Sequence, residues 1–167
     1  EVGIIEVKGR NVFKGYWNMP EKTAQEFRPD GFFITGDLGL IDPDGYVTIV
    51  GRGKDLIITG GFNVYPNEVE KVLMEHPAVL ECAVAGIPPP EKAGQEALKA
   101  WIVLKPEQSV TEQQIIDFCK ERLAPYAVPR RLTFLDALPK TVVGKILRRE
   151  VVDMDAEQQE ARPAETA

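Results

Sequence analysis

The sequence has few of the residues that form disulfide bonds or structural metal sites. It has two cysteines and one histidine among 167 residues, and no Cys/His cluster that would predict a metal site. Because Cys82 and Cys119 both lie within apolar patterns, we expect reduced core thiols in a cytoplasmic protein rather than a disulfide framework. No run of about 18 apolar residues occurs, so no membrane-spanning helix is predicted.

A concentration of positive charge is also missing. Lys and Arg are scattered and the net charge is −6, which argues against a nucleic-acid partner. Hydrophobic residues make up 44% and charged residues 28%, a balance typical of a globular protein with one domain or a domain and part of another. The chain has no secretory signal and begins with Glu1 inside an alternating strand pattern, so we expect a fragment whose N-terminal portion lies upstream.

The first 50 residues have the composition of short strands joined by turns. Pro20 predicts the first turn of a helix, and the segment Asp42-Pro43-Asp44-Gly45 predicts a hairpin turn. The elements expected here are a strand at 1–7, a helix at 20–27, a strand at 32–35 that ends at Gly36-Asp37, and hairpin strands at 38–41 and 46–50.

The pattern changes after Gly51-Arg52-Gly53-Lys54-Asp55, where two glycines and three charges predict a boundary or hinge. Strands are expected at 56–58, 79–87, 97–104 and 131–135, and helices at 66–77, 111–123 and 147–152. Thr111 should cap its helix in a capping box with Gln114, with Val110 and Ile115 as the hydrophobic staple.

This β-α-β-β-α-β order predicts an α+β fold, a small domain in which helices lie on one face of a mixed sheet. We expect this small C-terminal domain at residues 52–152, after a β-rich region at 1–51. Residues 153–167 lack aromatic residues and are expected to form a disordered tail.

Two glycine-containing segments are candidate ligand-binding elements. Gly144 allows a close backbone approach, and Lys145 can then offer a compact cation to a phosphate or carboxylate; the alternative is an exposed turn. Paired Gly60 and Gly61 before Phe62 could form a wall along which an extended ligand slides, or a tight strand-to-helix connection.

Two charged residues complete the candidate set. Asp37 at a strand end can accept hydrogen bonds from the vicinal hydroxyls of a ribose, or it is an ordinary turn aspartate. The Arg52 guanidinium suits phosphate or ribose oxygens, or it forms a surface ion pair with Asp55 or a neighbouring acid.

Taken together and in this order, these segments resemble the adenylate-forming superfamily: acyl- and aryl-CoA synthetases, peptide-synthetase adenylation domains and luciferases. The resemblance covers residues 1 to about 152 and is specific, because five spaced motifs match. The matching motifs are Gly15-Tyr16-Trp17-Asn18-Met19-Pro20-Glu21-Lys22-Thr23, Thr35-Gly36-Asp37-Leu38-Gly39, Gly51-Arg52-Gly53-Lys54-Asp55, Asn63-Val64-Tyr65-Pro66-Asn67-Glu68-Val69-Glu70, and Pro139-Lys140-Thr141 through Lys145. The Gly-Gly-Phe-Asn-Val-Tyr-Pro form is most similar to fatty-acyl-CoA and malonyl-CoA synthetases.

The resemblance implies a two-step reaction in which a carboxylate attacks the α-phosphate of ATP and CoA then displaces AMP. Mg²⁺ would arrive with ATP, and no metal ligand is assigned in this sequence. The roles that the resemblance implies are ribose binding for Asp37, nucleotide contact for Arg52, bridging of carboxylate and α-phosphate for Lys145, hinge for Lys54, and lining of the pantetheine tunnel for Gly60, Gly61 and Phe62.

The resemblance also assigns residues 1–51 to the end of a large AMP-binding domain and 52–152 to a mobile small domain. The expected parent is an ATP-dependent fatty-acid–CoA ligase; a malonyl-CoA or aryl-CoA synthetase, or a non-catalytic α+β module that binds nucleotide or CoA, are alternatives. Because the phosphate loop and acyl pocket would lie upstream, the chain alone is expected to lack adenylation activity. Pro88-Pro89-Pro90 and Gly94-Gln95 depart from the Pro-Asp and Gly-Glu often found in the family.

Overall fold

The computed structural model describes residues 1–88 and 96–160. The departures from the family pattern at Pro89-Pro90 and Gly94-Gln95, and residues 161–167 of the expected tail, lie outside the described residues. Within the described part of the chain, no helix is long and apolar enough to cross a membrane. The cytoplasmic location inferred from the cysteine content stays a prediction.

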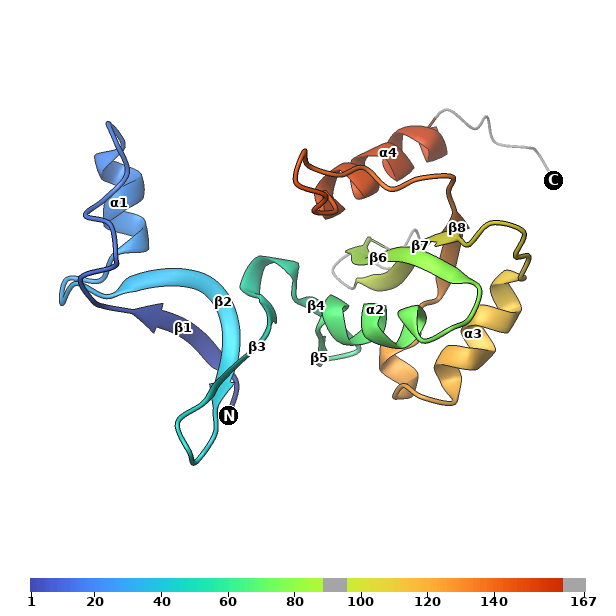
Figure 1. The fold of residues 1–167 in the computed structure, drawn as a ribbon, viewed down its shortest axis with the longest axis horizontal. Coiled ribbons are helices and arrows are strands. Elements are labelled where there is room, and N and C mark those ends of the chain that lie inside the picture. Colours follow the sequence, from blue (N-terminus) through green and yellow to red (C-terminus); the bar gives the residue numbers. More distant parts are fainter. Residues whose placement is uncertain (89–95, 161–167) are drawn as a thin grey trace. The chain divides into compact units, whose positions relative to one another are not determined.

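The chain divides into two compact units, Glu1–Leu56 and Ile57–Ala167 (Figure 1). The division falls directly after the segment 51–55, in which the sequence predicts a boundary or hinge. Each unit has its own sheet. The assignment of residues 1–51 and 52–152 to two domains of a larger enzyme stays a prediction.

In the first unit, three antiparallel strands form a sheet in the order β1-β2-β3. Its elements are β1 (Gly3–Val7), α1 (Pro20–Glu26), β2 (Phe33–Ile41), β3 (Val47–Arg52) and the 3₁₀-helix η1 (Gly53–Asp55). The predicted strand end at Gly36-Asp37 is wrong, because β2 continues through both residues. β1 and β3 pair with the two edges of β2. The β1–β2 pairing shifts register around Gly36, whose φ of 73° would otherwise interrupt a strand, and the β2–β3 pairing shifts between Leu38 and Gly39.

The second unit contains the predicted mixed sheet, in the order β6-β7-β8. β6 and β7 are antiparallel, and β7 and β8 are parallel. The elements are β4 (Ile57–Thr59), β5 (Phe62–Val64), α2 (Pro66–Met74), β6 (Val79–Ile87), β7 (Ala97–Leu104), α3 (Glu112–Lys120), the 3₁₀-helix η2 (Pro125–Ala127), β8 (Arg131–Phe134) and α4 (Arg148–Glu160). The β-α-β-β-α-β order is confirmed for β4, α2, β6, β7, α3 and β8, with the additional short strand β5 between β4 and α2.

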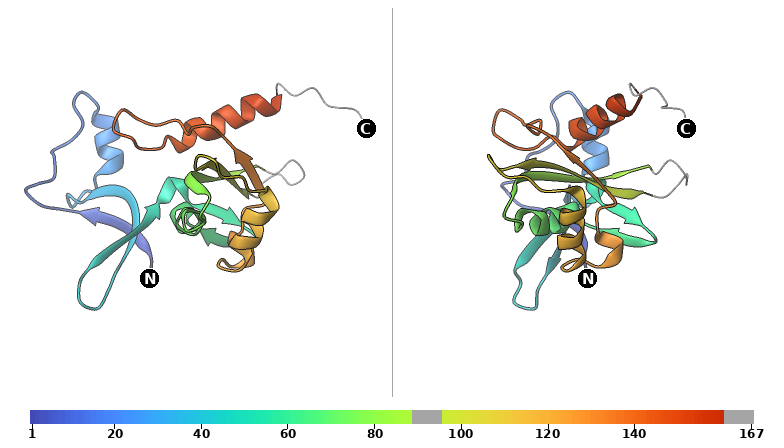
Figure 2. Two further views of the ribbon diagram at one scale, coloured as in Figure 1. Left: turned by 45° about the vertical axis from the view of Figure 1, so that its right-hand side comes forward. Right: turned by 90° about the vertical axis from the view of Figure 1, so that its right-hand side faces the viewer.

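Both faces of this sheet are covered by helices. α2 and α3 lie on one face as predicted, whereas α4 lies on the other, as both views in Figure 2 show. Which side chains of the sheet contact which helices follows from strand geometry, since successive side chains of a strand point to opposite faces. On the central strand β7, Ala100 and Ile102 face α2 and α3, and Trp101 and Val103 lie in the cluster that includes Val151 of α4.

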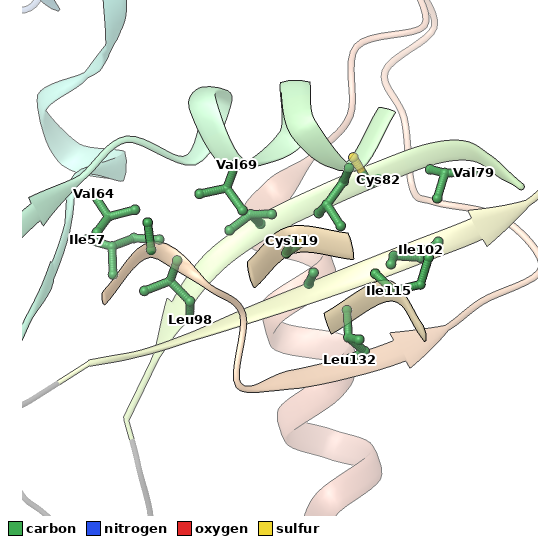
Figure 3. Packing of buried hydrophobic residues seen from close by; sticks show 14 residues of the cluster. Ile57, Val64, Val69, Val79, Cys82, Leu98, Ile102, Ile115, Cys119 and Leu132 are labelled. Carbon is green, nitrogen blue, oxygen red and sulfur yellow. The ribbon is translucent and has the colours of Figure 1, made fainter. Parts of the chain in front are cut away.

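The larger core cluster lies between the sheet and the helices α2 and α3 (Figure 3). Val69 and Leu73 of α2, and Ile115 and Cys119 of α3, are fully buried in it. Complete burial of such an aliphatic side chain stabilises a fold by about 1.5–3 kcal/mol. This cluster therefore fixes α2 and α3 on the sheet and gives the second unit a core of its own.

Local sequence sets the start of α3 as predicted. The Thr111 hydroxyl accepts a hydrogen bond from the Gln114 amide at 3.3 Å, and the Gln114 side chain accepts one from the Thr111 amide at 2.9 Å. The capping box is thus confirmed. Val110 packs against the core cluster that contains Ile115, as expected for the staple.

Helix α4 is longer than the sequence predicted. A helix was expected at 147–152 with a disordered tail from 153, but α4 extends to Glu160. The physical reason is tertiary: Asp155, a buried residue of α4, accepts hydrogen bonds from Lys99 at 2.5 Å and from the Trp101 indole at 3.3 Å. These bonds attach the second half of the helix to β7.

The two cysteines are free and buried, as predicted. Burial raises the pKa of the Cys82 thiol to about 12 and that of Cys119 to about 11. Both thiols are therefore protonated at neutral pH, and they act as small apolar core residues rather than nucleophiles.

Candidate functional site

Lys145 lies on a narrow, self-contained hairpin between β8 and α4. Lys140 and Ile146 form a β-bridge at its base, and the Thr141 amide donates to the Lys145 carbonyl at 2.8 Å. The turn is closed by the Gly144 amide, which donates to the Thr141 carbonyl at 2.9 Å. Gly144 has a φ of 82°, a conformation that L side chains rarely adopt, which explains the glycine before the lysine.

The Lys145 side chain is exposed, and its ammonium group has no ion-pair partner within residues 1–88 and 96–160. The two preceding residues, Val142 and Val143, are also exposed. A cation held on an ordered backbone without a carboxylate partner can neutralise an incoming phosphate or carboxylate without first breaking an ion pair.

Asp37 and Arg52 are brought together in the first unit. They are paired residues on β2 and β3, and the Arg52 Nε donates to the Asp37 Oδ1 at 2.8 Å. Both side chains keep solvent access, with 47% of Arg52 and 23% of Asp37 exposed. The sequence had offered a surface ion pair with Asp55 or a neighbouring acid as the ordinary explanation of Arg52. The acid that Arg52 contacts is Asp37, the other predicted nucleotide-binding residue.

The Asp37 backbone is held by Thr35. The Thr35 hydroxyl accepts a hydrogen bond from the Asp37 amide at 3.1 Å and donates one to the Ile5 carbonyl at 2.8 Å. These bonds fix the bend at Gly36 and direct the strand so that Asp37 faces Arg52 across the pairing. The arrangement presents a carboxylate and a guanidinium as one polar unit that suits a diol next to an anionic group.

Gly60 and Gly61 form the two-residue turn of the β4–β5 hairpin. Both have positive φ, 57° and 82°, which matches the tight turn that joins antiparallel strands. The sequence had not predicted β5, since its three residues are too few to show alternation. No atom of the described chain lies within 4 Å of a Cβ placed on either glycine, so the turn faces open space.

Phe62 stacks on an aromatic residue that the sequence analysis missed. Its ring lies 4.3 Å from that of Tyr126 in η2, with an interplanar angle of 8°. Phe62 is 53% and Tyr126 41% exposed, so the pair forms an apolar edge beside the glycine turn. A cavity of about 300 Å³ opens next to it, lined in part by Asn63, Tyr126 and Arg122. The only sequence indication for Tyr126 was an aromatic residue within a proline-flanked loop.

Lys54 is exposed in the short helix η1, directly before the end of the first unit at Leu56. Its backbone therefore belongs to the short connection between two compact units. Lys145 and the glycine turn lie on separate elements of the second unit and share no hydrogen bond. In the described residues, no group of three or more His, Cys, Asp or Glu side chains is placed to hold a metal ion.

Comparison with known proteins adds three findings. Residues 68–145 match the family described as AMP-binding enzyme C-terminal domain. A long-chain-fatty-acid–CoA ligase of Bacillus subtilis is 48% identical over 94% of the chain, and the match covers 28% of that protein. The chain therefore spans less than a third of the length of this curated relative.

Solved structures show the same relationship. ATP-bound MatB from Rhodopseudomonas palustris is 47% identical, with a TM-score of 0.85 over 95% of this chain and 31% of that one. The o-succinylbenzoate CoA synthetase MenE from Bacillus subtilis, in complex with ATP and magnesium, is 41% identical, with a TM-score of 0.82 over 92% of this chain and 31% of that one.

Proposed function

The chain belongs to the adenylate-forming superfamily, whose C-terminal part it represents, and we propose that it is the C-terminal portion of an ATP-dependent acyl-CoA synthetase. The observation that carries this proposal is Lys145, an exposed cation on an ordered glycine hairpin within the region that matches the family. The full-length enzyme would convert a carboxylate, ATP and CoA into acyl-CoA, AMP and pyrophosphate.

In the proposed first half-reaction, Lys145 bridges an oxygen of the carboxylate and an oxygen of the α-phosphate. Negative charge accumulates on the phosphate oxygens as the carboxylate attacks, and a positioned cation stabilises that charge. Asp37 would hold the ribose hydroxyls, and Arg52, already oriented by its 2.8 Å contact with Asp37, would contact the nucleotide. Mg²⁺ would enter with ATP, which is consistent with the MenE complex that contains both.

In the proposed second half-reaction, the small domain rotates about Lys54, withdraws Lys145 and brings the glycine turn to the acyl-adenylate. Gly60, Gly61 and Phe62 would then line the channel for the pantetheine arm of CoA, whose thiol displaces AMP. The open space around both glycines supports this role, as does the position of Lys54 next to the division between the units. Such gating motions are well known in enzymes.

The substrate we favour is a fatty acid, because the B. subtilis relative is named a long-chain-fatty-acid–CoA ligase. Short dicarboxylates and aryl acids are the competing substrates, since MatB and MenE are also similar to the chain.

To test the proposed activity and its substrate, pyrophosphate release by the full-length enzyme would be followed with ATP, CoA and acids from malonate to palmitate and benzoate. We expect activity with long-chain acids and none from residues 1–167 alone. No pyrophosphate with any acid would favour a non-catalytic module that binds nucleotide or CoA.

The glycine turn gives a prediction that separates the two half-reactions. In the full-length enzyme, Gly61→Val should slow thioester formation from a supplied acyl-adenylate by about 100-fold, because a branched side chain would displace the pantetheine arm. Pyrophosphate release in the first half-reaction should stay near the wild-type rate. Single-turnover assays of each half-reaction, by rapid quench, would measure both effects.

Gly45→Val is the matched control for backbone strain. Gly45 has a similar φ of 90° and equally open space around it, but it lies in the β2–β3 turn of the first unit and is not among the residues proposed to line the channel. It should leave both half-reactions unchanged. Equal slowing by the two variants, or a Gly61→Val enzyme that forms thioester normally, would argue against the channel.

A further inference from the structure

Among the residues that the structure describes, the hairpin that carries Lys145 is held to the rest of the unit through contacts at its base. Its tip has no packing, since Val143 is 85% exposed and Val142 is fully exposed. The hydrogen bonds inside the hairpin, between Thr141 and Lys145 and between Gly144 and Thr141, fix its shape but not its direction relative to the sheet. Contacts at the two ends of the hairpin must therefore set the position of Lys145.

At the N-terminal end, Lys140 is joined to the sheet. Its ammonium group donates to the Glu81 carboxylate of β6 in a short ion pair, with 35% and 30% of the two side chains exposed. Lys140 is also the residue whose backbone forms the bridge to Ile146. The Lys140 side chain thus links β6 to the first arm of the hairpin, which lies opposite the arm that carries Lys145.

At the C-terminal end, Arg148 is joined to helix α2. Its Nη2 donates to both Glu70 oxygens, at 2.8 Å and 3.0 Å, and the two side chains are only 25% and 19% exposed. The same Glu70 carboxylate accepts a hydrogen bond from the Val84 amide of β6 at 2.8 Å. Glu70 therefore connects α2, β6 and the first residue of α4.

We propose that Glu70 and Glu81 are positioning residues for Lys145, which direct its ammonium group through the ion pairs at the two ends of the hairpin. This inference rests on the proposed function of Lys145. Neither carboxylate would touch a substrate. Each carboxylate is anchored on the sheet or on α2, and each holds one end of the segment from Lys140 to Arg148. Without these pairs the hairpin keeps its internal bonds but can tilt as a whole.

The test uses the full-length enzyme with Glu81→Gln, Lys140→Met and Glu70→Gln, each of which removes one ion pair with little change of shape. We expect pyrophosphate release in a single turnover to fall by about 10- to 100-fold, the effect of a displacement near 1 Å at a reacting group. Thioester formation from supplied acyl-adenylate should stay within about twofold of wild type, because Lys145 is withdrawn in that step. The charge-swapped double variant Glu81→Lys/Lys140→Glu should recover most of the first half-reaction.

A purely structural role predicts an equal loss of rate in both half-reactions. Asp117→Asn removes a more exposed ion pair with Lys120, 2.8 Å long and within α3, and serves as the control that should change neither half-reaction. Hydrogen exchange should show unchanged protection at the Gly144 amide but faster exchange at the Leu147 amide, which bonds to the Pro139 carbonyl at the hairpin base.

Equal loss in both half-reactions, or no loss in the first, would overturn the positioning role. Failure of this inference differs from failure of the proposed function. If Lys145→Ala abolishes adenylation while the three ion-pair variants behave as wild type, only the positioning role is wrong. If Lys145→Ala is itself fully active, the proposed function of Lys145 is wrong as well.

Discussion

Lys145→Ala in the full-length enzyme is expected to slow pyrophosphate release by about 10²–10³-fold, the loss that follows removal of one donor to a developing oxyanion. The lysine is exposed, unpaired among the described residues and held on a rigid hairpin, so little of its interaction energy would be lost to reorganisation. Thioester formation from supplied acyl-adenylate should be almost unaffected. Rapid-quench measurement of each half-reaction with a fatty acid would give both rates.

Lys71→Ala is the matched control, since Lys71 is an exposed lysine on α2 outside the proposed site. It should retain wild-type rates in both steps. A Lys145→Ala enzyme that adenylates normally would remove the main support for the proposed chemistry. An equal loss in both half-reactions would mean that Lys145 is not withdrawn between them.

The second large effect concerns stability rather than catalysis. Lys99→Met should lower the free energy of unfolding of the second unit by about 3–5 kcal/mol, because it removes one partner of a buried ion pair. The pair is almost fully enclosed, with 7% and 8% of the side chains exposed. Urea unfolding of the chain, followed by the fluorescence of the buried Trp101, would measure the loss.

A double variant separates the stability that the ion pair contributes from the cost of removing only one of its partners. Lys99→Met/Asp155→Leu should be more stable than Lys99→Met, since no buried charge remains. It should still fall about 1–3 kcal/mol below wild type, because the Trp101 indole loses the carboxylate that accepts its hydrogen bond. Asp117→Asn, which breaks the exposed pair with Lys120, should cost at most about 1 kcal/mol. If Lys99→Met costs no more than this control, the ion pair is not what holds α4 on the sheet.

Several elements of the second unit could be predicted from local sequence. β6 and β7 follow from short apolar runs with turn residues at both ends, and the start of α3 follows from the capping box between Thr111 and Gln114. In each case the determining residues lie within one element or directly beside it. The mixed sheet also follows, because the alternation of strands and helices restricts how neighbouring strands can pair.

Elements that depend on distant partners were predicted less well. Gly36 looked like a strand end because its neighbours in sequence do not show that β1 and β3 pair with both edges of β2. The polar composition after residue 152 indicated disorder, yet Asp155 finds Lys99 and Trp101 on a strand far away in sequence. The charge of Lys99 within an apolar strand was the one local sign of such a partner.

The sequence by itself determined the family, the order of most elements and most of the candidate residues, because motif spacing and apolar periodicity are properties of neighbouring residues. Only the tertiary structure decided which of those residues meet. Strand register pairs Arg52 with Asp37 rather than Asp55, and chain folding places Tyr126 against Phe62. It also joins the ends of the Lys145 hairpin to Glu70 and Glu81. These contacts form when non-local elements close together, and no local pattern specifies them.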